Sequence, residues 1–226
     1  MIHIDGVTFA GVGPYNLQLD PAALTVVIGP NGAGKSLLLK LLHGLVKPLA
    51  GSIKRGDGDP TLAEQSFVAH ELGFLERSVR DNLVWLMRVH GMNKPEAFSH
   101  ADGLLQVAGL DHLSERPALT LSAGEQAILG LARGLVMQPR LVLLDEPTAH
   151  LDPRGTKSVE DVISDMRQRG LGILMTTHDF GQARRLAEQL IVMVDGKVVE
   201  AGAAADVLNT PKSAEAAAFL AGELVS

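Results

Sequence analysis

The chain alternates short apolar runs with longer stretches of helical character. Residues 26–28 (Val-Val-Ile) and 141–144 (Leu-Val-Leu-Leu) are continuously apolar, and the first run is entirely β-branched. Such runs are typical of strands that are buried on both faces of a parallel sheet. The pattern therefore predicts an α/β fold with a parallel sheet at its centre.

Turn residues divide the rest of the chain. Residues 1 to about 66 are expected to contain an antiparallel β edge, and Asp195-Gly196 predicts a type I′ hairpin. Residues from about 72 to 120 have little strand character and are expected to form an inserted helical subdomain. Helices are predicted at residues 36–45, 79–89, 95–107, 127–136, 152–169, 179–189 and 214–220.

Length, cysteine content and charge narrow the class of protein. The 226 residues suffice for one α/β domain, residues 1–226, with a smaller helical insertion. The chain has no cysteine, which excludes disulfides and thiolate metal sites. Its net charge of −6 argues against nucleic acid as a partner. We expect neither a secretory signal nor a membrane-spanning segment.

A glycine-rich segment lies between the first buried strand and a leucine-rich helix. Its glycines let the backbone turn tightly and bring N–H groups to a phosphate, and the helix N-terminus adds partial positive charge. The Lys35 amine would reach the β- and γ-phosphates, and the Ser36 hydroxyl would ligate Mg²⁺. A simple strand-to-helix turn is the alternative, but the complete spacing favours a nucleoside triphosphate. The residues expected to bind it are Gly29, Pro30, Asn31, Gly32, Ala33, Gly34, Lys35, Ser36 and Leu37.

Two acids and a histidine follow buried strands elsewhere. Asp145 and Glu146 end the run at 141–144, at the carboxyl edge where α/β sheets bind their ligands. Adjacent acids can also be solvated turn residues. His178 follows another apolar strand; a lone histidine is usually structural or solvated, but this position beside the phosphate edge favours a functional role.

A third segment, residues 121–126, begins a helix. Ser122 is a plausible N-cap, and Glu125 follows three residues later, so the segment is also an ordinary capping box. On its own, that structural interpretation would be preferred. Its place between the phosphate loop and the acidic strand favours a functional role in addition to capping.

In this order, segments 29–36, 121–126 and 141–146 resemble those of the ATP-binding cassette (ABC) ATPases, which are P-loop NTPases, and the resemblance extends along nearly the whole chain. It implies that Asp145 holds the water shell of Mg²⁺ and that Glu146 polarises the water that attacks the γ-phosphate. His178 then corresponds to the family's switch histidine.

The same resemblance implies a composite site. Ser122 and Gly124, at the start of the signature helix, would face the γ-phosphate of ATP bound to the opposite subunit. Residues 147–152, which include Asp152, match the loop that crosses to that subunit. Each ATP would lie between two chains, most simply two copies of this one.

Three positions depart from the family's pattern. Ala123 replaces the first glycine of the signature segment, which a helix tolerates well. His70 stands where a glutamine near Mg²⁺ is usual; Gln65 is the alternative ligand but lies too far from the downstream motifs. Third, no aromatic residue falls where the family usually stacks one on adenine, and Phe9 and Tyr15 are the only nearby candidates.

The resemblance implies an ATPase subunit that drives a membrane transporter, of the importer type and similar to cassettes of tungstate and other oxyanion importers around residues 75–82 and 219–224. The implied partners are a second ATPase subunit, transmembrane permease subunits and a solute-binding protein, with the chain peripheral on the cytoplasmic face of the cell membrane. The alternatives are a soluble non-transport ABC ATPase and a P-loop small-molecule kinase. A kinase would leave the segment at 122–126 and His178 unexplained.

Overall fold

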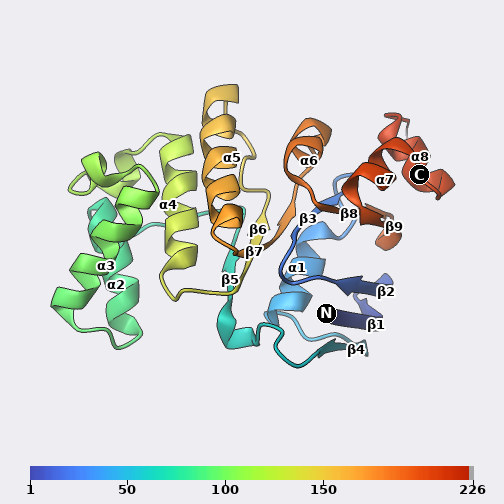
Figure 1. Ribbon diagram of the computed structural model, residues 1–226, viewed down its shortest axis with the longest axis horizontal. Helices are drawn as coiled ribbons and strands as arrows, with labels where there is room; N and C mark the ends of the chain where they lie inside the picture. Colours follow the sequence, from blue (N-terminus) through green and yellow to red (C-terminus); the bar gives the residue numbers. More distant parts are fainter. Residues whose placement is uncertain (224–226) are drawn as a thin grey trace.

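A mixed sheet forms the centre of the protein in the computed structural model, which describes residues 1–223 (Figure 1). Within these residues, five parallel strands and one antiparallel edge strand have the order β5-β6-β7-β3-β8-β9. The bounds are β3 Leu24–Ile28, β5 Gln65–Val68, β6 Leu141–Asp145, β7 Gly172–Thr176, β8 Gln189–Val194 and β9 Lys197–Ala203. The predicted α/β class with a parallel sheet is confirmed.

Alternate residues of the central strands enter two different cores. Val26 and Val142 belong to a core that also contains the buried faces of several helices, whereas Val27 and Leu143 face a second core. Every residue of β3, β6 and β7 is buried. Burial on both faces explains why these strands are continuously apolar rather than alternating.

A smaller antiparallel sheet covers one side of this centre. Its order is β2-β1-β4, with β1 at Ile2–Phe9, β2 at Val12–Leu19 and β4 at Ala50–Arg55. Ile4, Tyr15 and Leu17 of this sheet share the second core with α1, residues Lys35–His43. The predicted antiparallel edge is therefore present, and it packs against the helix that follows the phosphate loop.

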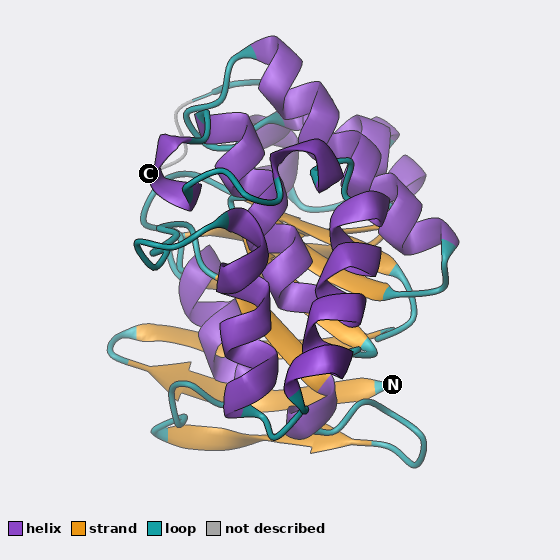
Figure 2. Cartoon of the chain, turned by 90° about the vertical axis from the view of Figure 1, so that its left-hand side faces the viewer, coloured by secondary structure: helices purple, strands orange, loops and turns teal. Residues whose placement is uncertain are grey.

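Two helices fill the region between residues 72 and 120 at the far end of the molecule from the small sheet (Figure 1). These are α2 at Val79–Val89, with the predicted bounds, and α3 at Lys94–Val107. Ser78 and Asn93 cap them by accepting hydrogen bonds from backbone N–H groups. Short 3₁₀ turns at Leu62–Glu64, Asp111–Leu113 and Ala118–Thr120 connect the neighbouring elements. Figure 2 shows the helices of this end standing in front of both sheets.

The remaining helices follow the motifs. They are α4 Ala123–Leu135, α5 Pro153–Gln168, α6 Phe180–Leu186, α7 Ala204–Asn209 and α8 Ala214–Leu220. Both residues of the Asp195-Gly196 turn have positive φ, 46° and 73°, as a type I′ turn requires. Leu224, the last residue of the segment similar to oxyanion importers, lies outside the described residues.

Two helix ends were predicted wrongly. The first helix ends at His43 rather than residue 45, because Gly44 turns with a φ of 83° and its N–H bonds back to Leu41. Helix α6 ends at Leu186 rather than residue 189, because the Glu188 N–H bonds to Leu24 and draws the chain into β8. In both cases a tertiary or capping contact ends the helix before its apolar pattern does.

Candidate nucleotide-binding and catalytic site

The phosphate loop connects β3 to α1 at the carboxyl edge of the sheet. Gly34, the N-cap of α1, has a φ of 91°, which is a conformation that favours glycine. A Cβ at this position would lie 2.7 Å from the Tyr15 hydroxyl. The last glycine of the loop is therefore required both by its backbone conformation and by the close approach of a buried side chain.

Lys35 is folded back over this loop. Its amine is buried and donates hydrogen bonds to the carbonyl oxygens of Gly29 at 2.9 Å and Pro30 at 3.0 Å. It also lies 3.7 Å from Oε1 of Glu146. Burial lowers the pKa of Lys35, while the carboxylates of Glu146 and Asp145 act in the opposite direction. The loop and the acidic strand end thus meet at one amine.

Asp145 joins the loop to the neighbouring strand. Its Oδ1 accepts hydrogen bonds from the hydroxyls of Ser36, at 2.7 Å, and Thr176, at 2.8 Å. Thr176 is fully buried at the end of β7, and its hydroxyl also accepts the backbone N–H of Glu146 at 2.9 Å. The sequence interpretation missed Thr176; its place opposite Asp145 in the strand pairing is the signal that could have found it.

Glu146 has an unusual backbone and a histidine partner. Its φ of 48° is rare for a residue with a side chain and is typical of constrained functional positions. Its Oε2 lies 3.0 Å from Nδ1 of His178. Glu146 is half-buried and His178 is exposed, so the pair opens toward solvent above the phosphate loop.

The structure therefore brings together Lys35, Ser36, Asp145, Glu146 and His178, which come from three strand ends. A hollow of about 330 Å³ lies over the loop. Its lining consists of Asn31, Gly32, Gly34, Lys35, Ser36, Leu37, Lys40 and Glu146.

The residues of the signature segment lie elsewhere. Ser122, Gly124 and Asp152 line a separate hollow of about 760 Å³ and do not line the one above the phosphate loop. The capping box predicted at Ser122 is confirmed: its hydroxyl accepts the N–H of Glu125 at 3.3 Å, and the Glu125 carboxylate accepts the Ser122 N–H at 2.7 Å. Asp152 caps α5 by accepting the N–H of Gly155 at 2.6 Å.

Strand register separates Gln65 and His70, the two residues expected as alternatives for a Mg²⁺ contact. Gln65 pairs with Leu141 at the start of β5, which is the end of the parallel strands away from the phosphate loop. Val68 pairs with Leu144, so His70 follows at the same edge as Asp145. The His70 ring lies 5.7 Å from that of His150, centroid to centroid. Gln65 cannot be the ligand, and a role for His70 remains a prediction.

Burial separates Tyr15 and Phe9, the two aromatic candidates for stacking on adenine. Tyr15 is fully buried, and its hydroxyl has no hydrogen-bond partner among residues 1–223. Burial raises its pKa to about 12, so it stays neutral. A ring enclosed by the core cannot stack on adenine, so Tyr15 is excluded. Phe9 is partly buried and packs against the second core.

A sequence model of the family described as ABC transporter matches residues 12–149, which is more than half of the chain. The chain belongs to this family. It is an ATP-binding subunit with the fold and the motifs of the ATPases that energise ABC transporters.

Curated relatives agree with this assignment. The chain is 34% identical over 231 residues to the phosphate import ATP-binding protein PstB 2 of Natronomonas pharaonis, an alignment that covers 92% of this chain and 80% of that protein. It is 34% identical over 189 residues to the tungstate uptake system ATP-binding protein TupC of Peptoclostridium acidaminophilum, covering 82% and 88%. The methionine import ATP-binding protein MetN of Bacillus subtilis is 34% identical over 209 residues, but the chain spans only 61% of its length.

Solved structures share the fold. The chain superposes on cbiO1 from Clostridium perfringens, part of the ABC transporter complex cbiONQ, with a TM-score of 0.84, 24% identity and coverage of 97% and 94%. It matches the ATP-binding cassette MJ0796, in a dimeric post-hydrolysis state bound to ADP and Pi, with a TM-score of 0.77, 22% identity and coverage of 90% and 99%. Within residues 1–223, no helix has both the length and the apolar character needed to cross a membrane.

Proposed function

We propose that this chain is the ATPase subunit of an ABC importer and that it works on the cytoplasmic face of the membrane with separate permease subunits. The observation that carries the proposal is a connected cluster at the phosphate loop. Lys35, Ser36 and Glu146 line one hollow, Asp145 accepts a hydrogen bond from Ser36, and His178 contacts Glu146. The direction of transport is supported by relatives that are named for the import of phosphate, tungstate and methionine.

The donor atoms around Ser36 fit Mg²⁺. The Ser36 hydroxyl and the Asp145 carboxylate are hard oxygen donors 2.7 Å apart. Within residues 1–223, no group of three or more acidic, histidine or cysteine side chains could enclose a metal. Mg²⁺ usually keeps several waters and binds through few carboxylates together with substrate phosphates, so Ser36 and Asp145 are a sufficient pair of protein donors. When bound, the ion would neutralise charge on the phosphates.

The chain's own groups then divide the work. Lys35 would exchange its two carbonyl partners for phosphate oxygens. Glu146 would orient the attacking water and accept its proton, while the contact with His178 holds the carboxylate over the loop. The Thr176 hydroxyl fixes both acids, because it donates to the Asp145 carboxylate and accepts the backbone N–H of Glu146.

The separation of the two hollows supports a composite site in a homodimer. Because Ser122, Gly124 and Asp152 line a different hollow from Lys35, they would serve ATP held by the partner's phosphate loop. A closed symmetric dimer would contain two such sites.

A groove beside His70 suits a permease helix. A hollow of about 190 Å³ lies between β5 and α4 and is lined by Ala69, Leu72 and Arg133, among others. The Arg133 guanidinium lies 5.2 Å from the centre of the Phe74 ring. We propose that this groove receives the permease.

We also propose that the complete transport system includes a solute-binding protein and that the system carries an oxyanion of the phosphate or tungstate kind.

Transport in a defined orientation tests this function. The chain is reconstituted with the integral membrane subunits that co-purify with it, in vesicles that enclose both the chain and ATP, and the solute-binding protein of the system is supplied outside. Uptake of tungstate or phosphate is then measured, with methionine as the comparison cargo. We expect accumulation of an oxyanion inside the vesicles. ATP-driven loss of solute to the outside would indicate an exporter, and ATP turnover without membrane subunits in any complex would favour a soluble ATPase.

His70 is expected to tolerate glutamine but not alanine. In His70→Gln an amide oxygen takes the imidazole's place near Mg²⁺, so ATP turnover should stay within about twofold of the unchanged protein. His70→Ala should weaken the stimulation of turnover by the permease more than it weakens ATP affinity. Steady-state ATPase assays with and without the permease measure both effects. His90→Ala, at an exposed position after α2, is the control. A large loss in His70→Gln would contradict the assignment.

A further inference from the structure

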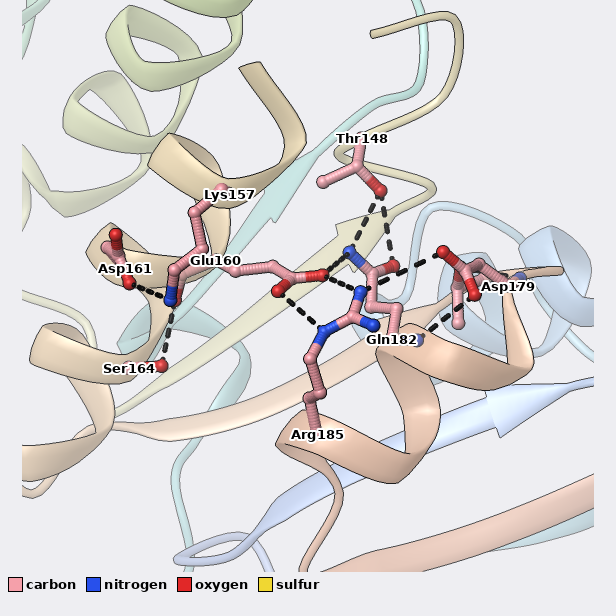
Figure 3. Close-up of polar contacts among 9 residues, drawn as sticks. Thr148, Lys157, Glu160, Asp161, Ser164, Asp179, Gln182 and Arg185 are labelled. Carbon is pink, nitrogen blue, oxygen red and sulfur yellow. Dashed lines mark hydrogen bonds and ion pairs between the residues drawn. The ribbon is translucent and has the colours of Figure 1, made fainter. Parts of the chain in front are cut away.

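A carboxylate outside the nucleotide site is buried in the helix layer. Glu160 of α5 is only 3% exposed. Its two oxygens accept hydrogen bonds from the Arg185 guanidinium at 3.0 and 2.6 Å, and Oε1 also accepts the Gln182 amide at 3.2 Å. Figure 3 shows this group between α5 and α6. A buried carboxylate is costly unless it is paired, so Glu160 depends on Arg185 and Gln182 as partners.

The amide of Gln182 carries this contact to the loop after Glu146. Gln182 is fully buried, and both ends of its amide lie within hydrogen-bonding distance of the Thr148 hydroxyl, with Oε1 at 3.1 Å and Nε2 at 3.0 Å (Figure 3). Thr148 is two residues beyond Glu146. Its neighbour Ala149 bonds through its N–H to the Glu146 carbonyl at 3.1 Å, which closes the turn on which Glu146 stands.

The same amide belongs to the helix that follows His178. Asp179 caps α6 by accepting the backbone N–H of Gln182 at 3.1 Å, and it lies 3.9 Å from Arg185. The start of α6, and with it the position of His178, is therefore tied to Glu160 through both Gln182 and Arg185. One buried carboxylate on α5 connects the segments that carry the two members of the Glu146–His178 contact.

We propose that Glu160 is a positioning residue, which acts through Gln182 and Thr148 to hold Glu146 and His178 in the geometry needed for hydrolysis. The proposal rests on the proposed role of Glu146. It is distinct from a general contribution to stability, because the network touches the segments at 147–152 and 178–186 and not the phosphate loop. Loosening it should reduce turnover while leaving ATP binding intact.

Two conservative variants test the network. Glu160→Gln removes the charge that Arg185 binds, and Thr148→Val keeps the shape of the side chain but breaks the link to Gln182. Each is expected to lower kcat by roughly ten- to a hundredfold, since a misplacement of about 1 Å can cost 10²-fold, with the KM for ATP nearly unchanged. Hydrogen exchange of the full chain should rise in residues 147–152 and 178–186 and stay unchanged in residues 29–36. Asp161→Asn, the next residue of α5, breaks an exposed ion pair with Lys157 and should alter neither measurement.

The outcomes separate the possibilities. Faster exchange confined to the two segments, together with the loss in kcat, supports the proposal. Faster exchange with unchanged kcat, loss of protection throughout the chain, or a loss in kcat without local change in exchange would each overturn it. Thr148→Val keeps the test valid if Glu160→Gln does not fold. Glu146→Gln is measured beside them: full turnover in that variant would refute the proposed role of Glu146 itself, whatever the network does.

Discussion

Replacing Glu146 by glutamine should abolish most steady-state ATP hydrolysis while preserving ATP binding. The amide has nearly the shape of the carboxylate but cannot accept a proton from the attacking water, and such a loss costs about 10²- to 10⁴-fold in rate. Lys35, Ser36 and Asp145 remain in place, so the nucleotide should still bind. Turnover is measured with the partner subunits present, and binding is measured by equilibrium titration.

The stalled variant should also accumulate as an ATP-bound dimer, which size-exclusion chromatography with ATP would detect. Glu96→Gln, an exposed residue in the first turn of α3, is the matched control and should behave as the unchanged chain. Near-normal turnover by Glu146→Gln would contradict the proposal that this residue accepts the proton of the attacking water.

Combining two inactive variants should restore ATPase activity. Ser122→Arg places a bulky cation where the partner's γ-phosphate would dock, and Lys35→Ala removes the phosphate-binding amine, so each homodimer should have no intact site. In a mixed dimer both lesions fall in one site, and the other site is intact. Random mixing should therefore recover roughly a quarter of the original turnover, since half the dimers are mixed and each has one of two sites.

The arrangement of the lesions supplies the control. A chain that carries both substitutions, mixed with the unchanged chain, forms mixed dimers with a lesion in each site, so those dimers should add no activity. Ser99→Arg, on the exposed face of α3, controls for the added charge and size. If Ser122→Arg alone hydrolyses ATP at the original rate, the signature helix does not contribute to the site.

Local sequence was sufficient for features that depend on neighbours along the chain. The glycine spacing before Lys35 predicted the turn into a helix, because that conformation depends on backbone sterics. Asp195-Gly196 predicted the hairpin for the same reason. Ser122 and Glu125 predicted a capping box because its hydrogen bonds join residues only three positions apart. The fully apolar strands predicted a sheet covered on both faces. The family's motifs then indicated which residues meet at its carboxyl edge.

Contacts between distant segments were decided only by the tertiary structure. Gln65 and His70 are five residues apart, and strand register alone places them at opposite ends of the parallel strands. Tyr15 could stack on adenine by its residue type, but packing encloses it beneath Gly34.

Thr176 and Glu160 carry no local signal either, because their partners come from other strands and helices. The sequence by itself therefore determined the motifs, the fold class and most of the residues expected at the site. The fold decided how these residues are held, since a hydrogen bond between segments depends on packing that no short window of sequence describes.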